Sequence, residues 1–532
     1  MKFRKKSILT ILIAMLAIVM SVITACGQKT DPANGNEPSK SNDSDDKPVT
    51  IVLAQPSDPS TLDPHKAAGD QGANVWRNIC ESLTTYDGQD NLIPYLAKSW
   101  EQVSENEWIF HLEEGVKFSN GESFNAEAVG WNLDRGADTD NPRQNMEYRK
   151  FYEKGNWEAI DEYTIKITTT KPNFLMPNHM CDLPIIAPAY STEIGEDAIG
   201  SSPVGTGPYM LSTWSADQQI TLVKNPNWRG DEPEIDTYII RTIPEAATRV
   251  AELINGNVDI LYDLNYEYVD MLKNQANVKF DNKITRRIEY IGFNTTEWTP
   301  NPELYDVRVR QAINYAIDRD AIIKNIMGGF STPVASIWRP DFQDYDPDIK
   351  GYDYNPEKAK ELLREAGYEN GFEIELLTTD GNHAKASEVC EAVAAYLGDV
   401  GIKCTVKNYD DATSRSIIIN GQDQKLCPGM FDWNWASKPK LYETWLTGIV
   451  HSTGMSSYNY IEGYDKLVDD ILGSKTIEER TQYIKELQQT LIDNPPYLYL
   501  FQLGSIYVTT ERLDWSPSGT QFILAKEMKI SR

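Results

Sequence analysis

Helical and strand-like patterns alternate through the second half of this chain, and their order limits the folds it can adopt. A helix is expected over residues 355–367, because an Asn-Pro-Glu start supplies a cap, a first-turn proline and an early acid. A strand pattern follows at 372–378, then a helical pattern at 389–400 and a strand pattern at 403–409. This helix–strand–helix–strand order favours an α/β lobe.

The first half of the chain is richer in strands and loops, which indicates an α+β lobe. Apolar residues alternate with polar ones at 108–112, 165–167 and 220–222, as in half-buried strands. Helical spacing runs over 306–326 and again over 476–491, where a Thr-x-x-Glu capping box opens the helix.

The N-terminus has the features of an export signal. Four basic side chains lie within residues 2–6, and residues 8–22 are nearly all apolar, which is short of the about 20 residues that span a bilayer. The run ends in Ile-Thr-Ala before Cys26, which resembles a bacterial lipobox. We interpret 1–25 as a signal peptide and Cys26 as a lipidated cysteine at the outer face of the cell membrane. The alternative is an ordinary secretory signal with an incidental cysteine.

The segment after Cys26 is expected to be a flexible linker. Residues 28–47 contain no large apolar side chain, so they cannot offset the chain entropy lost on folding. Folded sequence is expected from Pro48, with a strand over 49–53. The remaining residues, about 485, exceed what one hydrophobic core usually holds, so two or more lobes are expected.

Charge and composition exclude several classes of partner and cofactor. The net charge is −28, and removal of a signal with four positive charges leaves about −32, which argues against nucleic acid and anionic membrane surfaces. The 13 Trp and 28 Tyr are a surplus that often lines ligand clefts. No C-x-x-C spacing occurs, and the odd number of cysteines after Cys26 indicates buried thiols, with one disulfide as the alternative. These cysteines are Cys80, Cys181, Cys390, Cys404 and Cys427.

Catalytic motifs are not found, so an enzyme and a cofactor are not expected. The chain lacks G-x-S-x-G, H-E-x-x-H and a dinucleotide fingerprint. Its five histidines include no pair at i, i+4, which gives metal binding little support.

A series of short motifs resembles the family 5 extracellular solute-binding proteins of ABC importers, the dipeptide- and oligopeptide-binding group. The motifs are T-L-D-P-H at 61–65, P-Y-L-A-K-S-W-E at 94–101, E-G-V-K-F at 114–118, P-V-G-T-G-P-Y at 203–209, N-P-N-W at 225–228, V-R-V-R-Q-A-I at 307–313, A-I-D-R at 316–319 and Y-N-P-E-K-A at 354–359. The glycines at 205 and 207 are expected to give a scaffold turn its backbone freedom.

The resemblance implies an α/β, two-lobe periplasmic-binding-protein-like fold (venus flytrap) with an extra subdomain in lobe I. Lobe I is expected over 48–290, with the extra subdomain at about 92–200, and lobe II over 291–499. Residues 500–532 are expected to return to lobe I. The implied partners are a small solute and an ABC permease, with membrane contact through the lipid anchor only.

The resemblance also implies where the solute binds. Peptide binders of the family hold the peptide amino group with an Asp in a loop that corresponds to 431–439, but here Ser437 or Lys438 occupies that place, and Asp432 is the only acid. The usual carboxylate-binding Arg is absent from 379–385, where His383 or Lys385 are the candidates to replace it.

The expected binding residues come from both lobes. Of Trp433 and Trp435 we expect one in the core and one at the ligand, and favour Trp435. The full set is Trp435, Asn434, Ser437, Lys438, Trp433 and His383 from lobe II, with Asp70 and Asn74 from lobe I.

The resemblance predicts a lipoprotein that captures a peptide or peptide-like solute for import. Alternatives for the solute are an oligosaccharide, an anionic compound such as an opine or glutathione, and nickel. A surface structural or adhesive protein is the alternative from another class.

Overall fold

The computed structural model describes residues 47–531, except 68, 90, 139–146, 340–341, 343, 381–384, 422–423, 437–441 and 518–521. Its internal contacts separate Met1–Lys47 from Pro48–Arg532, and every element below belongs to the second unit. Within the described residues, no helix is both long enough and apolar enough to cross a membrane. The expected signal peptide, linker and Cys26 lie outside the described residues.

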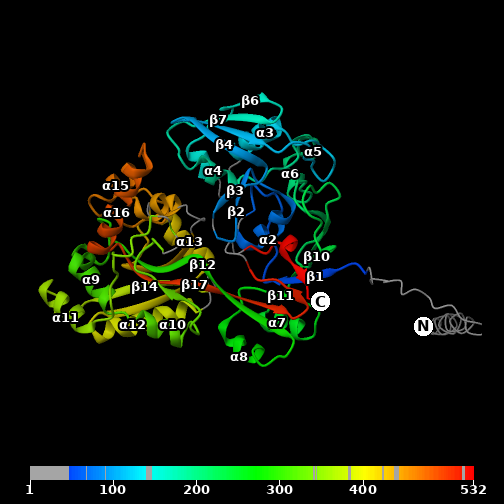
Figure 1. Cartoon of the computed structure of the whole chain (residues 1–532). Helices are drawn as coiled ribbons and strands as arrows, with labels where there is room; N and C mark the ends of the chain where they lie inside the picture. The colour runs from blue at the N-terminus through cyan, green and yellow to red at the C-terminus, as the bar shows by residue number, and fades with distance from the viewer. Residues whose placement is uncertain are drawn as a thin grey trace, which may run out of the picture. The chain divides into compact units, whose positions relative to one another are not determined.

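The central feature is a mixed sheet of 11 strands, which crosses the middle of Figure 1. Its strands, in spatial order, are β15 (Lys403–Asp410), β14 (Glu373–Asp380), β16 (Met430–Ala436), β12 (Val278–Phe293), β17 (Tyr497–Thr510), β11 (Ile260–Leu261), β1 (Thr50–Gln55), β10 (Thr237–Thr242), β9 (Gln219–Lys224) and β8 (Tyr209–Ser215), with β13 (Thr332–Pro333) beside β17. β14 runs parallel to β15 and β16, and β1 runs parallel to β10 and β11. β12 is antiparallel to β16 and β17.

The two longest strands, β12 and β17, join the N-terminal strands to those of residues 373–436. Their pairing shifts register between Ile284 and Ile288, which marks a bulge where β12 passes from one group to the other. Thr285 ties this bulge to β17, because its hydroxyl donates to the Leu503 carbonyl at 2.8 Å. Bulges of this kind turn side chains away from the regular pleat.

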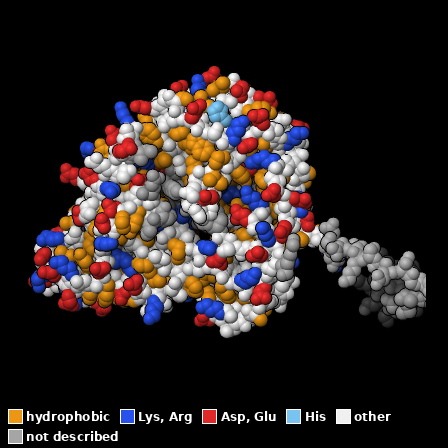
Figure 2. Space-filling model, viewed as in Figure 1, with side chains coloured by type: hydrophobic (Ala, Val, Ile, Leu, Met, Phe, Trp, Pro, Cys, Tyr) orange, Lys and Arg blue, Asp and Glu red, His pale blue; other side chains and the backbone are white. Residues whose placement is uncertain are grey.

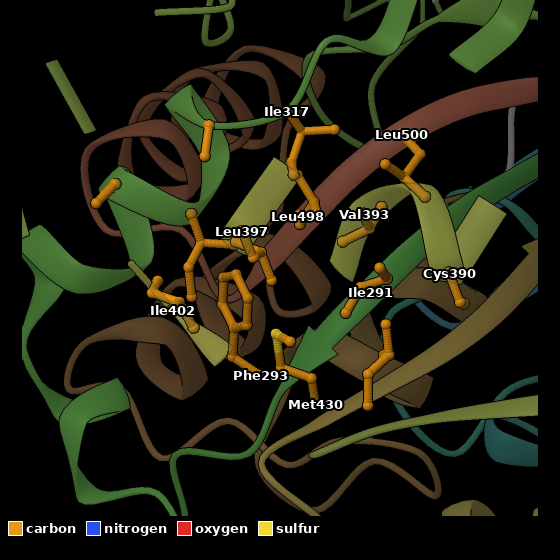
Figure 3. Packing of buried hydrophobic residues seen from close by; sticks show 14 of the residues in the cluster. Ile291, Phe293, Ile317, Cys390, Val393, Leu397, Ile402, Met430, Leu498 and Leu500 are labelled. Carbon is orange, nitrogen blue, oxygen red and sulfur yellow. The ribbon is translucent and has the colours of Figure 1, made fainter. Parts of the chain in front are cut away.

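Where β12 and β17 pair with the strands of residues 373–436, each face of the sheet is covered by its own helices. One face packs against α9 (Val307–Tyr315), α10 (Arg319–Asn325), α11 (Pro356–Glu365) and α12 (Ala386–Asp399). In Figure 3, Ile291 and Phe293 of β12 gather with Leu498 and Leu500 of β17 and with side chains of α12. The other face packs against α13 (Asp411–Asn420), α14 (Glu443–Trp445), a π-helical turn (Leu446–Val450), α15 (Tyr464–Leu472) and α16 (Ile477–Asp493).

The N-terminal half contains further cores. α2 (Gly69–Ile79) packs on β1 and β8–β10 together with Ile523, Ala525 and Met528 from the C-terminal end. A separate sheet in the order β4 (Ala97–Ser104), β5 (Glu107–Leu112), β7 (Thr164–Thr168), β6 (Trp157–Asp161) packs with α3 (Ala126–Gly136) around its own buried cluster. The remaining helices and strands are β2 (Thr84–Tyr86), β3 (Leu92–Pro94), α4 (Met176–His179), α5 (Pro188–Ile194), α6 (Glu196–Ile199), α7 (Ala246–Ile254), α8 (Val269–Leu272), β18 (Leu513–Asp514) and β19 (Lys529–Ile530).

Several local predictions are confirmed, among them two helix caps and three strands. The Asn355 side chain accepts from the Lys358 N–H at 2.9 Å and opens α11. The Thr476 hydroxyl accepts from the Glu479 N–H at 3.1 Å and opens α16. Alternation at 108–112, 165–167 and 220–222 falls on β5, β7 and β9.

Two local predictions are wrong. The helix expected over 306–326 is divided into α9 and α10, because Asp318 caps a new helix by accepting from the Ala321 N–H. The glycine at 205 does not adopt a left-handed conformation; it is required because a Cβ there would collide with the backbone carbonyl of Ile79.

Candidate functional site

Trp433 and Trp435 lie on the same face of the sheet, so the expectation that they divide between core and ligand by alternation is wrong. Trp433 is opposite Tyr290 and Trp435 is opposite Ile288 in the β12–β16 register, and residues two apart on a strand share a face. Trp433 is buried, whereas Trp435 is only half-buried near the end of its strand, with its ring against Gly448. The difference in exposure comes from position along the strand.

Asn434 points to the opposite face, and its carboxamide is almost entirely buried. It lies opposite Glu289 in the register, and its side-chain oxygen accepts a hydrogen bond from Arg287 Nη1 at 3.0 Å. A guanidinium can only donate, so the Asn434 oxygen must face Arg287 and the amide nitrogen must face elsewhere. That nitrogen has no hydrogen-bond partner among the residues that the structure describes.

Arg287 joins this strand to the N-terminal half. It lies within the bulge of β12, and its Nη2 lies 3.9 Å from Asp70 Oδ2 at the start of α2. The backbone at Gly69 has φ of 77°, a left-handed conformation that glycine adopts readily as the chain enters α2. The structure therefore brings together two predicted binding residues, Asp70 and Asn434, on either side of an arginine that was not predicted.

Tyr262 lies close enough to Asp70 to be affected by its charge. Burial, and after it the negative charge of Asp70, hold the pKa of Tyr262 well above its usual value of 10.0. Its hydroxyl is buried, and within the described parts of the chain it has no hydrogen-bond partner.

Asn74 serves the fold through its carboxamide oxygen. The side chain is buried on α2, and the oxygen accepts from the Ile523 N–H at 3.0 Å. Asn78, one turn along α2, holds the same C-terminal segment by accepting from the Ala525 N–H at 2.8 Å. These bonds fix the C-terminal segment to the helix that carries Asp70. The other predicted residues, Ser437, Lys438 and His383, lie outside the described residues.

Arg287 and Tyr262 were missed by the sequence interpretation. Arg287 belongs to an Arg-Arg pair inside a strand, and consecutive charges there are unusual enough to have been noticed. Tyr262 follows a strand of two residues, and no local pattern separates it from core tyrosines. Their closeness to Asp70 and Asn434 depends on the sheet register and on the position of α2.

A second set of distant elements surrounds a small open pocket. Its lining comes from the segment around α4 and from the helices that cover the Trp433 face: Phe151, Pro172, Asn173, Phe174, Leu175, His179, Glu443, Leu472 and Arg480. Next to Phe151 in the chain, Lys150 donates from its Nζ to Thr447 Oγ1 at 2.9 Å. Figure 2 shows a hollow near the middle of the face in view, with acidic, basic and apolar side chains around it.

Comparisons with known proteins agree on one family. The model described as bacterial extracellular solute-binding proteins, family 5 Middle, matches residues 91–457. The glutathione-binding protein GsiB of Escherichia coli (strain K12) is 32% identical over 464 residues, covering 85% of this chain and 88% of GsiB.

Two solved structures show the same fold. The periplasmic binding protein DppA from Helicobacter pylori, in complex with the peptide STSA, has a TM-score of 0.74 and 23% identity, covering 91% of this chain and 98% of its own. NikA from Brucella suis, in complex with Fe(III)-EDTA, has a TM-score of 0.80 and 21% identity, covering 91% and 100%. The expected two-lobe α/β fold is thereby confirmed.

Proposed function

Because this chain belongs to the family 5 bacterial extracellular solute-binding proteins, we propose that it captures a peptide or peptide-like solute and delivers it to an ABC permease. The observation that carries this proposal is the meeting of Asp70, from the N-terminal half, with Arg287 and Asn434 at the crossing of the long strands. A site shared between distant segments is suited to a solute that is held when those segments close on it.

The crossing strands also support a hinge. The register shift in β12 between Ile284 and Ile288 interrupts the ladder to β17, and Thr285 and Gln502 bond to backbone carbonyls across it. We assign lobe I to about 48–290, its extra subdomain to 92–200, lobe II to 291–499, and the return to lobe I to 500–532. Closure is then a rotation of lobe II relative to lobe I about the bulge, while the strand pairing within each lobe is kept.

Peptide-like solutes rank first because the relatives named above include a glutathione binder and a protein crystallised with a tetrapeptide. Neither usual dipeptide anchor is present in the sequence, so the solute is held by other groups. The same family places the protein outside the cytoplasm, and Cys26 provides the lipid anchor. The family consists of binding proteins, and we propose no catalysis for this chain.

Isothermal titration calorimetry of the purified mature protein tests the proposal. The panel consists of glutathione, a Met-Leu dipeptide, a Ser-Thr-Ser-Ala tetrapeptide, an opine, a maltooligosaccharide and a nickel–histidine complex. Saturable heat with glutathione or a peptide is expected. Binding of the sugar alone would reverse the ranking of solutes, and a protein that binds none of the panel would fit a structural surface role instead.

A further inference from the structure

The extra subdomain touches lobe II through Lys150. This residue ends a 3₁₀ helix (Glu147–Lys150), and its Nζ donates to the Thr447 hydroxyl at 2.9 Å. The hydroxyl has one proton, which it donates to the Glu443 carbonyl at 2.9 Å, so its oxygen is available to accept from the lysine. Lys150 and Thr447 are 297 positions apart in the chain, so their contact depends on how the subdomain and lobe II meet.

The turn that carries Thr447 has an unusual geometry. The segment Leu446–Val450 is π-helical, and the His451 N–H closes it by donating to the Leu446 carbonyl at 2.8 Å. Single π-helical turns occur frequently at functional sites. Gly448 in this turn packs on Trp435, because a Cβ at that position would lie 2.9 Å from Trp435 Cζ2. The turn therefore connects the Lys150 contact to β16, the strand that carries Trp435.

Apolar side chains accompany this hydrogen bond. Phe174 and Leu175 of the extra subdomain line the same small pocket as Leu472 of lobe II. Phe174 and Leu175 are half-buried, and the described buried cluster of their own subdomain includes neither of them. Covering apolar surface is favourable. Contact with lobe II therefore stabilises a part of the subdomain that its own core leaves uncovered.

Polar side chains of the pocket walls have partners within their own lobe. Arg480 of lobe II forms an ion pair with Glu443 of the same lobe. On the extra subdomain, the Asn173 side chain accepts from the Leu175 N–H at 2.9 Å. These pairs persist when the walls separate, so separation leaves none of these groups unpaired. The lysine–threonine hydrogen bond between the walls is exposed, and the contact is therefore suited to open and close.

We propose that Lys150 and Phe174 of the extra subdomain close on the π-helical turn of lobe II as a latch that retains the solute. This inference rests on the proposed function and adds the extra subdomain to the parts of the protein that hold the solute. Both are positioning residues, since they act by holding the lobes together and not by touching the solute. Because the latch forms only after closure, it slows dissociation of the solute and leaves association nearly unchanged.

Cross-linking tests whether this contact forms in solution, with or without a solute. Mature protein with Lys150→Cys and Thr447→Cys is treated with a short bismaleimide, and linked peptides are identified by mass spectrometry. The background is Cys404→Ser, because Cys404 is the free cysteine of the described residues that is not buried. The control pair is Lys98→Cys with Thr447→Cys, since Lys98 is an exposed lysine of β4 in the same subdomain. A 150–447 link well above the control is expected, and its absence would overturn the proposal.

Stopped-flow kinetics test whether the contact retains the solute. Glutathione is the first probe, followed by the other members of the calorimetric panel. Lys150→Ala and Phe174→Ala should each raise the dissociation rate about two- to tenfold and change the association rate less than about twofold. The controls Lys98→Ala and Ile160→Ala, an exposed apolar residue of β6, should leave both rates unchanged. Wild-type dissociation rates in both latch variants would overturn the proposal.

Thr447→Val completes a double-mutant cycle with Lys150→Ala. Both substitutions remove the same hydrogen bond, so the double variant should release the solute no faster than the faster single variant. Rate increases that multiply would mean that Lys150 does not act through Thr447, and would overturn the latch. A protein that binds no member of the panel contradicts the proposed function, and the cross-link then decides whether the contact exists.

Discussion

Asp63→Asn is expected to destabilise the protein strongly, because Asp63 forms a buried ion pair. Its side chain is 1% exposed and that of Arg135 is 4% exposed. Two parallel hydrogen bonds join them, from Arg135 Nη1 to Oδ1 at 3.0 Å and from Nη2 to Oδ2 at 2.6 Å. The amide would place an N–H₂ donor against guanidinium donors and would remove the counter-charge.

The size of the effect follows from the burial. Removing one partner of a buried pair costs about 3–5 kcal/mol. Arg135 keeps a second partner, since its Nε donates to the partly exposed Glu196 at 2.9 Å, so the lower end is expected. With about 2.1 cal/mol/K of unfolding entropy per residue over about 485 residues, 3 kcal/mol corresponds to a fall in Tm of about 3 °C.

Differential scanning calorimetry measures this change. The control is Glu114→Gln, which breaks the exposed Lys98–Glu114 pair and should cost about 0–1 kcal/mol, or less than about 1 °C. If both variants melt within about 0.5 °C of wild type, the reasoning about the buried pair is refuted.

The same pair gives a pH dependence. Burial by itself raises the pKa of Asp63, but hydrogen bonds and the charge of Arg135 outweigh it and hold the pKa below the ordinary 3.8. A carboxyl whose pKa is lowered by folding stabilises the protein above the unfolded-state pKa and loses this contribution as pH falls through the folded-state pKa. The Tm difference between wild type and Asp63→Asn should therefore shrink below about pH 4. A constant difference down to pH 2 would contradict this.

Three further outcomes are expected. Trp433→Ala should cost roughly 3–5 kcal/mol of folding stability and lower Tm, because its ring is buried, whereas Trp435→Ala should cost less, because that ring is half-buried at the end of the strand; an equal fall in Tm in both variants would contradict this difference. Gly205→Ala should yield a destabilised protein because its Cβ meets backbone, while Gly398→Ala in α12, with open space around it, should raise stability by about 0.5–1 kcal/mol. Cys26→Ala should release the protein from the membrane fraction or leave an unprocessed precursor, and unchanged lipid labelling of that variant would disprove the anchor.

Local structure could be predicted where it depends on neighbours in the chain. The cap at Asn355, the capping residue Thr476 and the alternating strands are set by backbone geometry within a few residues. The helix over 306–326 was wrong because apolar spacing continues through Asp318, although a capping residue there starts a second helix. Periodicity reports which residues face the core and is insensitive to a short break.

The candidate site could be predicted only in part. The sequence placed Asp70 and Asn434 at the binding region, and the structure brings them to either side of Arg287. It gave no indication that Arg287 lies between them, because this depends on a bulge in one strand and the approach of a helix from elsewhere in the chain.

The sequence by itself determined the family, most of the order of α and β elements and the helix caps, since each depends on short motifs or local periodicity. Only the tertiary structure decided which face each strand residue occupies and which distant charges meet. Trp433 lies opposite Tyr290 in a buried cluster, and Arg287 contacts Asp70, because register and long-range pairing fix these directions. A shift of one residue in register would turn every side chain of β16 to the other face, and no local signal specifies that choice.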